Sequence, residues 1–434
     1  MVVVVSHLFL FLGDKFRGRC DSCESHLPLC GTIYFPTAPL FTFYTFLPAR
    51  NYFFIYFMTC LLISERVLSP LMGGVIMSSP TTKPRDYLFD NCKAFLILMV
   101  VLGHFTEGSY QHTDFLYTLK WLIVSFHMPA FIFISGYFSK RELSLSALIW
   151  KLGVPYLVYE VVYYLLYTLV LHRPTSLALM FPKFSLWYIL ALFVWRLVTP
   201  YVKKIPHHFL LSIAAGLLIG CVDGMPSNFL SIPRILVFYP FFLAGMYCDR
   251  SWITRLRTRV SRLVSLAGIA AFIIFLVLEP RHKELSVKIF YGRYSYEFLG
   301  QDPIAGILCR IICYAVGAFM TFAILMLMTE RQTAFSYIGT RTMAIYIFHG
   351  LTYSCLRRGT PLLDHIDTLA GSFILIAFCI LLTGVFSLPQ FTSITNRIAS
   401  LSLPQHPLPH RPVFLPFHRP ENRVFIWKST YYPR

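Results

Sequence analysis

The stretch "DNCKAFLILMVVLGHF", residues 90–105, is an apolar segment of helix length that carries Lys93 and His104. Eleven residues at ~100° each make about three full turns, so both side chains lie on one helix face, ~16 Å apart along the axis. That separation is about half of a ~30 Å hydrocarbon core. An ionisable group at such depth costs roughly 2.5–3.5 kcal/mol and needs a partner or a polar cavity. Snorkelling explains Lys93 alone equally well, but it does not explain His104.

The composition places this helix in a membrane protein. Of the 434 residues, 56% are hydrophobic and 13% are charged, whereas a soluble domain carries about 25% charged residues. The 38 Lys and Arg against 20 Asp and Glu fit cytoplasmic loops and anionic lipid head groups. Because no basic run coincides with a nucleic-acid fold signature, we exclude nucleic acid as a partner and expect membrane lipids.

The pattern predicts an all-α, polytopic fold with about ten transmembrane helices in a domain over residues 85–390. Three of the segments, 209–222, 235–248 and 342–356, are shorter than a typical span. The predicted helices lie near 88–106, 119–138, 152–171, 185–202, 209–222, 235–248, 263–279, 304–328, 342–356 and 369–388.

The two ends of the chain differ from this domain. Residues 1–84 read as an extension or leader, and we expect the functional polypeptide to begin near Met77, before a polar basic segment. Residues 391–434 are rich in Pro and His and predict a disordered cytoplasmic tail. The segment "CDSCESHLPLC", residues 20–30, has a zinc-like spacing, but half of a zinc module is missing. We therefore predict no metal site.

Orientation follows from the basic loops. The segment "DRSWITRLRTRVSR", residues 249–262, is the strongest short basic loop, so the positive-inside rule places it in the cytoplasm. The count of helices then places Lys93 at the cytoplasmic mouth, His104 towards the outer side, and both ends of the helical domain in the cytoplasm. A plasma or cytoplasmic membrane is the expected location.

Further ionisable residues fall inside apolar segments. His127 lies two turns into the next predicted helix, at a depth similar to that of His104, so the two histidines form a candidate catalytic pair. Glu160, Arg196, Arg310 and His349 interrupt later helices. Each of them has a structural alternative, such as neutralisation of Glu160 by an arginine, but together they predict a polar cavity in the membrane.

Five stretches occur in the order and spacing of a known family. They are "DNCKAFLILMVVLGH" (90–104), "SFHMPAFIFISGYF" (125–138), "LWYILALFVWRL" (186–197), "RILVFYPFFLAGMY" (234–247) and "TMAIYIFHG" (342–350). The chain thereby resembles the acyltransferase 3 family, and within it the branch of fucose 4-O-acetylase-like membrane acetyltransferases. A basic residue eleven positions before an essential histidine marks that family. Here these positions are Lys93 and His104, with lysine in place of the usual arginine.

The resemblance implies transfer of an acetyl group from acetyl-CoA, a co-substrate and not a permanently bound cofactor, to a hydroxyl of a sugar or lipid-linked glycan. His104 would be the general base, or less favourably an acyl carrier, and His127 would orient or relay. Lys93, with Arg141 and Arg196, would hold the CoA phosphates. Glu160, Arg310 and His349 would be substrate-binding or structural polar residues.

Two other classes compete with this interpretation. A multi-pass transporter would use the buried His, Glu and Arg residues as a proton or substrate relay. Its typical internal repeats and broken helix pairs are not found in the sequence. A non-catalytic scaffold would leave the cost of so many buried charges unexplained.

Overall fold

The computed structural model describes residues 85–224, 228–278 and 285–400, which all belong to one unit of the chain. These residues form helices and connecting loops, and no β-strand occurs among them. Seven helices in the described ranges are long and apolar enough to cross a membrane. The protein is therefore a multi-pass membrane protein of the all-α class. The leader, the zinc-like segment and most of the predicted tail lie outside the described residues.

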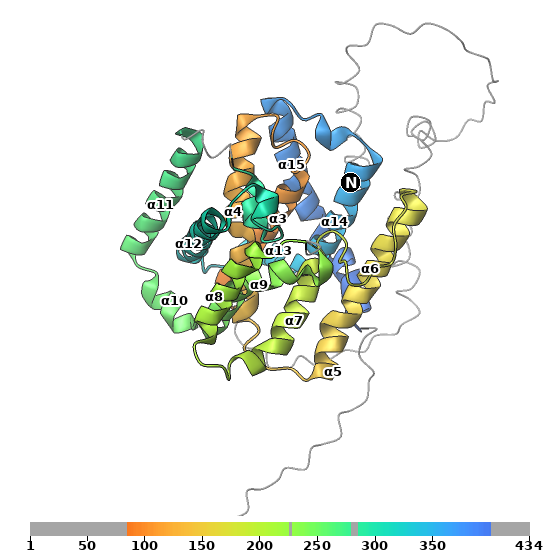
Figure 1. The fold of residues 1–434 in the computed structure, drawn as a ribbon. Helices are drawn as coiled ribbons and strands as arrows, with labels where there is room; N and C mark the ends of the chain where they lie inside the picture. Colours follow the sequence, from red (N-terminus) through yellow and green to blue (C-terminus); the bar gives the residue numbers. More distant parts are fainter. Residues whose placement is uncertain (1–84, 225–227, 279–284, 401–434) are drawn as a thin grey trace, which may run out of the picture. The chain divides into compact units, whose positions relative to one another are not determined.

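Helix α3, Tyr87–Phe105, occupies the centre of the fold (Figure 1). Asp86 caps its first turn, since its carboxylate accepts a hydrogen bond from the backbone N–H of Leu88. The helix contacts α4 (Asp114–Tyr137), α13 (Ala334–Gly339), α14 (Thr342–Gly359) and α15 (Leu369–Phe386). Its two ends define the directions used below, the Lys93 end and the His104 end.

Helix α4 returns from the His104 end and crosses α9, Ile232–Tyr247, at very close range. A Cβ on Gly136 would lie 2.0 Å from the carbonyl oxygen of Phe242, and one on Gly245 would lie 1.9 Å from that of Phe133. Each glycine thus faces the backbone of the other helix. Small residues at such a crossing allow the two helix backbones to approach closely.

The segment between these helices is less regular. Helices α5 (Leu145–Leu148) and α6 (Val154–Leu165) are continued by the π-helical turns η3 (Ile149–Gly153) and η4 (Leu166–Val170). Together they span residues 145–170. Helix α7, Trp187–Val202, then leads back to the Lys93 end, and α8 (His208–Leu218) with η5 (Ile219–Cys221) returns. The short turn η6, Phe229–Ser231, leads directly into α9.

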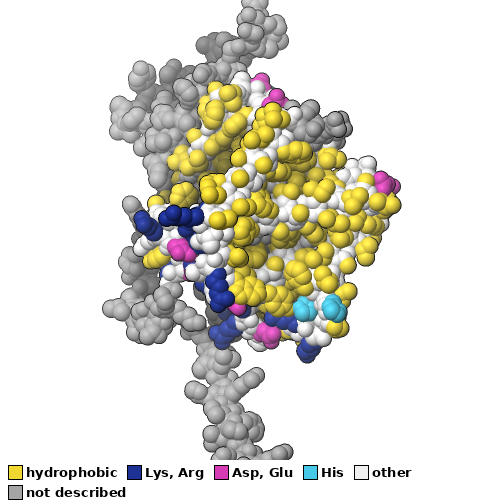
Figure 2. Space-filling view, turned by 90° about the vertical axis from the view of Figure 1, so that its left-hand side faces the viewer, with side chains coloured by type: hydrophobic (Ala, Val, Ile, Leu, Met, Phe, Trp, Pro, Cys, Tyr) yellow, Lys and Arg dark blue, Asp and Glu magenta, His cyan; other side chains and the backbone are white. Residues whose placement is uncertain are grey.

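Helices α11 (Arg259–Leu278) and α12 (Pro303–Leu327) pack on each other and expose many apolar side chains. Val277 is 64% exposed and Ile304 is 72% exposed. Figure 2 shows this hydrophobic surface, with Lys and Arg side chains gathered along its lower part. Such a surface is costly in water and suited to lipid. The short helix α10, Arg250–Leu256, precedes α11, and the turns η8 (Val287–Tyr291) and η9 (Glu297–Leu299) precede α12.

The C-terminal part corrects one predicted boundary. The turn η10, Leu362–Asp364, joins α14 to α15, and a further helix, α16, covers Pro389–Ser400. Phe391 is 4% exposed and lies with its ring centroid 4.8 Å from that of Phe348 in α14. Folded structure therefore continues past residue 390, where the sequence predicted a disordered tail. The sequence did not predict this helix, because its buried aromatic residue, Phe391, stands in a segment of mostly polar residues next to a proline-rich one.

Each of the ten predicted segments contains a helix, but not all of them are confirmed as spans. Helices Trp187–Val202 and His208–Cys221 are apolar but shorter than a typical span, and α14 is not among the seven candidates. The third predicted helix begins at Leu145 rather than at residue 152, because hydrophobic periodicity does not reveal the π-helical turn that joins α5 to α6.

The glycine crossing makes a direct prediction. Gly245→Ala forces α4 and α9 apart, and we expect it to destabilise the purified protein by about 1–3 kcal/mol, as overpacking does. The matched control is Gly384→Ala in α15, where a Cβ meets nothing within 4 Å. Thermal unfolding in detergent should show a lower Tm for Gly245→Ala only, and equal Tm values for the two variants would contradict the packing assigned here.

Candidate active site

A cage of rings surrounds His104 in the last turn of α3. Its ring centroid lies 4.6 Å from Phe184, 5.5 Å from His349 and 6.0 Å from Tyr353. Phe184 stacks on Tyr353 at 5.1 Å with an interplanar angle of 27°. The histidine is partly buried, between α14 and the loop before α7. The structure therefore brings together His104 and His349, two of the residues expected from sequence.

His349 is held in one tautomer. Its Nδ1 lies 2.9 Å from the carbonyl oxygen of Ile345, so in the neutral ring Nδ1 carries the proton and donates it. The side chain is fully buried, and Nε2 has no hydrogen-bond partner in the described part of the chain. An unsatisfied buried nitrogen costs about 1–3 kcal/mol. Nε2 is therefore an acceptor ready for a hydroxyl group.

His127 is fixed in the same way on α4. Its Nδ1 lies 2.8 Å from the carbonyl oxygen of Ile123, which leaves Nε2 as the acceptor. The ring contacts of His104, however, are with α14 and the 171–186 loop rather than with His127. From equal depth the sequence predicted that His104 and His127 form a pair. In the structure the ring of His104 lies close to the ring of His349 instead. The catalytic role assigned to His127 stays a prediction.

The loop that carries Phe184 is tied down by a buried ion pair. Glu160 of α6 is fully buried; its Oε1 accepts a hydrogen bond of 2.7 Å from the Lys183 backbone N–H, and its Oε2 lies 3.4 Å from Lys183 Nζ. Phe184 has a positive φ of 48°, a conformation costly for a residue with a Cβ. The structural alternative given above for Glu160 was neutralisation by an arginine, whereas the residue that pairs with it is Lys183.

A second ion pair, between Lys120 and Glu107, lies at the C-terminal end of α3. The buried ammonium of Lys120 donates hydrogen bonds to the carboxylate of Glu107 and to the carbonyl oxygen of Gly103. The hydroxyl of Tyr291 donates to the same carboxylate at 2.7 Å. A cation near the C-terminal carbonyls of a helix is favourable. This group fixes the turn that holds His104, and sequence reasoning overlooked it.

At the opposite end of α3, Lys93 pairs with its own helix. Its Nζ lies 2.9 Å from Oδ1 of Asp90, whose Oδ2 accepts a hydrogen bond from Arg85 at 2.7 Å. The ammonium also lies 5.4 Å from the ring centroid of Phe138. The side chain of Lys93 keeps 24% exposure, so part of its charge faces outward.

Two other predicted cations lie near the C-terminal end of α4. Arg141 follows Phe138 by three residues, and its carbonyl oxygen accepts a hydrogen bond of 3.0 Å from Arg196 Nη2. Arg250, in contrast, is bound to Asp86 and Glu330 at 2.7 and 2.8 Å. The hydrogen bond from Arg250 lowers the pKa of Glu330, so this carboxylate stays ionised and occupies the arginine.

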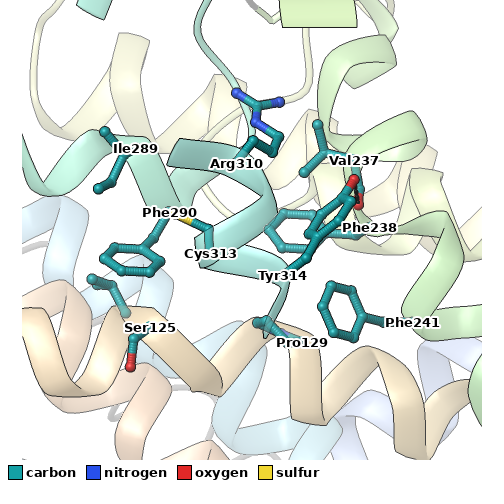
Figure 3. A pocket seen from close by; sticks show the side chains of 11 residues that line it. Ser125, Pro129, Val237, Phe238, Phe241, Ile289, Phe290, Arg310, Cys313 and Tyr314 are labelled. Atoms are coloured by element: carbon teal, nitrogen blue, oxygen red, sulfur yellow. Dashed lines mark hydrogen bonds between the residues drawn. The ribbon is translucent and has the colours of Figure 1, made fainter. Parts of the chain in front are cut away.

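Arg310 lies apart from the ring cage. It is 4% exposed and donates long hydrogen bonds to the carbonyl oxygens of Gly216 (3.4 Å) and Tyr294 (3.5 Å). Its guanidinium carbon lies 5.1 Å from the ring centroid of Tyr296. Figure 3 shows it on α12 beside a small pocket, whose other walls come from α4, α9 and the Val287–Tyr291 turn. A structural role at the end of α8 accounts for these contacts.

Comparison with known proteins assigns the chain to a family. Residues 86–388 match the acyltransferase 3 family, described as an acyltransferase domain. The chain belongs to the acyltransferase 3 family. No curated protein and no solved structure gives a significant match. The matched range contains the ring cage and both ends of α3. The protein is thus a membrane acyltransferase, and this family membership favours the enzyme over the transporter and the scaffold.

The ion pair under Phe184 can be tested. Lys183→Met leaves the carboxylate of Glu160 buried without its cation, and we expect a loss of about 3–5 kcal/mol of stability together with loss of activity. The double variant Glu160→Gln/Lys183→Met removes both charges and should recover most of that loss. Thermal unfolding compares these variants with Lys151→Met, an exposed lysine on the neighbouring turn. An unchanged Tm in Lys183→Met would refute the role of the pair.

Proposed function

We propose that this acyltransferase moves an acetyl group from acetyl-CoA to a hydroxyl of a sugar or glycan acceptor, as in the fucose 4-O-acetylase-like branch. The observation that carries this proposal is the pair formed by His104, in the last turn of α3, and the fully buried His349 of α14. Their ring centroids lie 5.5 Å apart, and Nε2 of His349 is a free acceptor. A thioester is already activated. The enzyme therefore has chiefly to deprotonate an alcohol and to stabilise the transition state.

In the proposed reaction, a neutral His104 takes the proton of the acceptor hydroxyl as the oxygen attacks the thioester carbonyl carbon. The tetrahedral intermediate then collapses, the C–S bond breaks, and the CoA thiolate leaves and is protonated by the imidazolium. The products are an O-acetyl ester and free CoA. His349 Nε2 can accept a hydrogen bond from the acceptor and so orient it, and the tautomer seen at Ile345 supports this role.

The donor would bind at the Lys93 end. Lys93 keeps an exposed part, and Arg141 and Arg196 are linked by a hydrogen bond nearby. These cations suit the phosphates of CoA, for which lysine acts as a point charge and arginine as a bidentate donor. The basic segment 249–262 supports a cytoplasmic position for this end, where acetyl-CoA would enter. The His104 end would then face the opposite side, in a plasma or cytoplasmic membrane.

The two ends of α3 should give different kinetic defects. In His104→Ala we expect kcat for acetyl transfer into membrane glycans to fall about 10²–10⁴-fold, since general base catalysis is lost. The KM for acetyl-CoA should stay unchanged. In Lys93→Gln we expect a raised KM for acetyl-CoA with most of kcat retained. Transfer from radiolabelled acetyl-CoA measures both constants.

Lys204→Gln is the control for the lysine variant, because Lys204 is exposed at the same end of the fold. His127→Ala and His349→Ala, measured in the same assay, rank the two candidate partners of His104. Labelling at the wild-type rate in His104→Ala would refute the proposed base. Identical KM values in Lys93→Gln and the control would refute the donor site.

A further inference from the structure

The first turn of α9 holds a cation in an unfavourable position. Arg234 is the third residue of this helix, and a helix N-terminus carries a partial positive charge that repels a cation. The arginine is partly buried within the candidate membrane span Phe229–Tyr247. A charge at this place is costly unless something compensates it.

The partners of Arg234 do not neutralise it. Its Nη1 donates a hydrogen bond of 3.3 Å to the amide oxygen of Asn228, and its guanidinium carbon lies 4.8 Å from the ring centroid of Trp187. No carboxylate pairs with it in the described residues. An anion bound at this place would offset the desolvation cost of the guanidinium.

The residue that begins the helix supplies a second observation. Ser231 is the N-cap of α9 and is fully buried, yet its hydroxyl makes no hydrogen bond to the N–H groups of the first turn or to any other described residue. The backbone adds few donors here, because the Ile232 N–H already donates to the carbonyl oxygen of Phe229 and Pro233 has no N–H. The unpartnered hydroxyl of Ser231 and the guanidinium of Arg234, which has no carboxylate partner among the described residues, are the donors suited to an anion.

This turn is connected to the histidine pair. The Asn228 side chain that accepts from Arg234 donates through Nδ2 to the carbonyl oxygen of Pro182 at 2.8 Å. Two residues later in the same loop, Phe184 packs on the ring of His104. A molecule bound at the start of α9 therefore lies on the His104 side of the fold rather than at the Lys93 end.

We propose that the first turn of α9, with Arg234 and Ser231, binds an anionic group of the acceptor, a phosphate or a carboxylate. The inference rests on the proposed function, because it assigns this anion to the molecule that receives the acetyl group. It narrows the acceptor class to acidic or phosphorylated glycans. Arg234 is then a specificity-determining residue and not part of the donor site.

Binding of amphiphilic probes tests the site without any catalysis. Dodecyl phosphate and dodecyl glucuronide are added to the purified full chain, with dodecyl maltoside as the neutral probe. We expect an anionic probe at 100 times its Kd to raise the apparent stability by about 2.7 kcal/mol, seen as a higher Tm. The two anionic probes distinguish a phosphate from a carboxylate source.

The increase should disappear in Arg234→Gln, be partly kept in Arg234→Lys, and be unchanged in Arg173→Gln, an exposed arginine of the loop before α7. Ser231→Ala should reduce it. No increase in the wild type, or an equal increase in Arg234→Gln, would overturn the proposal. Because these readouts need no acetyl transfer, they are independent of the proposed function.

Rates of acetyl transfer distinguish two roles for Arg234, binding of the acceptor's anionic group and stabilisation of the oxyanion in the tetrahedral intermediate. With octyl glucuronide and octyl glucoside as acceptors, we expect Arg234→Gln to lower the preference for the charged acceptor at least tenfold and to leave acetyl-CoA hydrolysis unchanged. A parallel fall in hydrolysis and in both transfers would assign Arg234 to the oxyanion and overturn the acceptor site. Loss of all reactions in His104→Ala tests the catalytic base separately.

Discussion

The cost of ionisable side chains in a low-dielectric medium governs this structure. Helix α3 is apolar for most of its length, yet it carries Lys93 near one end and His104 near the other. Each needs neighbours that make its presence tolerable. Lys93 obtains a carboxylate one turn away on the same helix, and His104 obtains aromatic rings and a second histidine from elements far away in the chain. These demands place α14 and the loop before α7 against α3.

The surrounding ion pairs have the same origin. Glu107 and Lys120 close the turn after His104, and Glu160 and Lys183 anchor the loop that carries Phe184. These pairs stabilise the position of the rings around His104 more than they stabilise the fold, because a buried pair gains little over apolar packing. Among the buried polar atoms without a hydrogen bond in the described residues, Nε2 of His349 and the hydroxyl of Ser231 lie where a substrate can supply the missing hydrogen bonds.

Much of this arrangement was predictable from the sequence. Long apolar segments predicted the helices, and the eleven-residue spacing predicted that Lys93 and His104 share one helix. Depth alone, however, could not choose between His127 and His349 as the neighbour of His104, since helix order in a bundle depends on side-chain packing. The roles of Lys183 and Phe184 were missed because they lie in a polar loop without periodicity. Arg234 begins one of the five stretches shared with the family, residues 234–247. Only the structure shows that no carboxylate among the described residues pairs with its guanidinium.

The central claim is that α3 joins a donor site on one side of the membrane to an acceptor site on the other. Sealed vesicles with the full chain, in which a cysteine replacing Lys140 marks the Lys93 end, test this directly. Acetyl-CoA does not cross the bilayer. We predict that it labels glycan only when it is added on the side of the cysteine, and that the labelled glycan lies on the opposite side. Labelling that requires donor and acceptor on the same side would contradict the account.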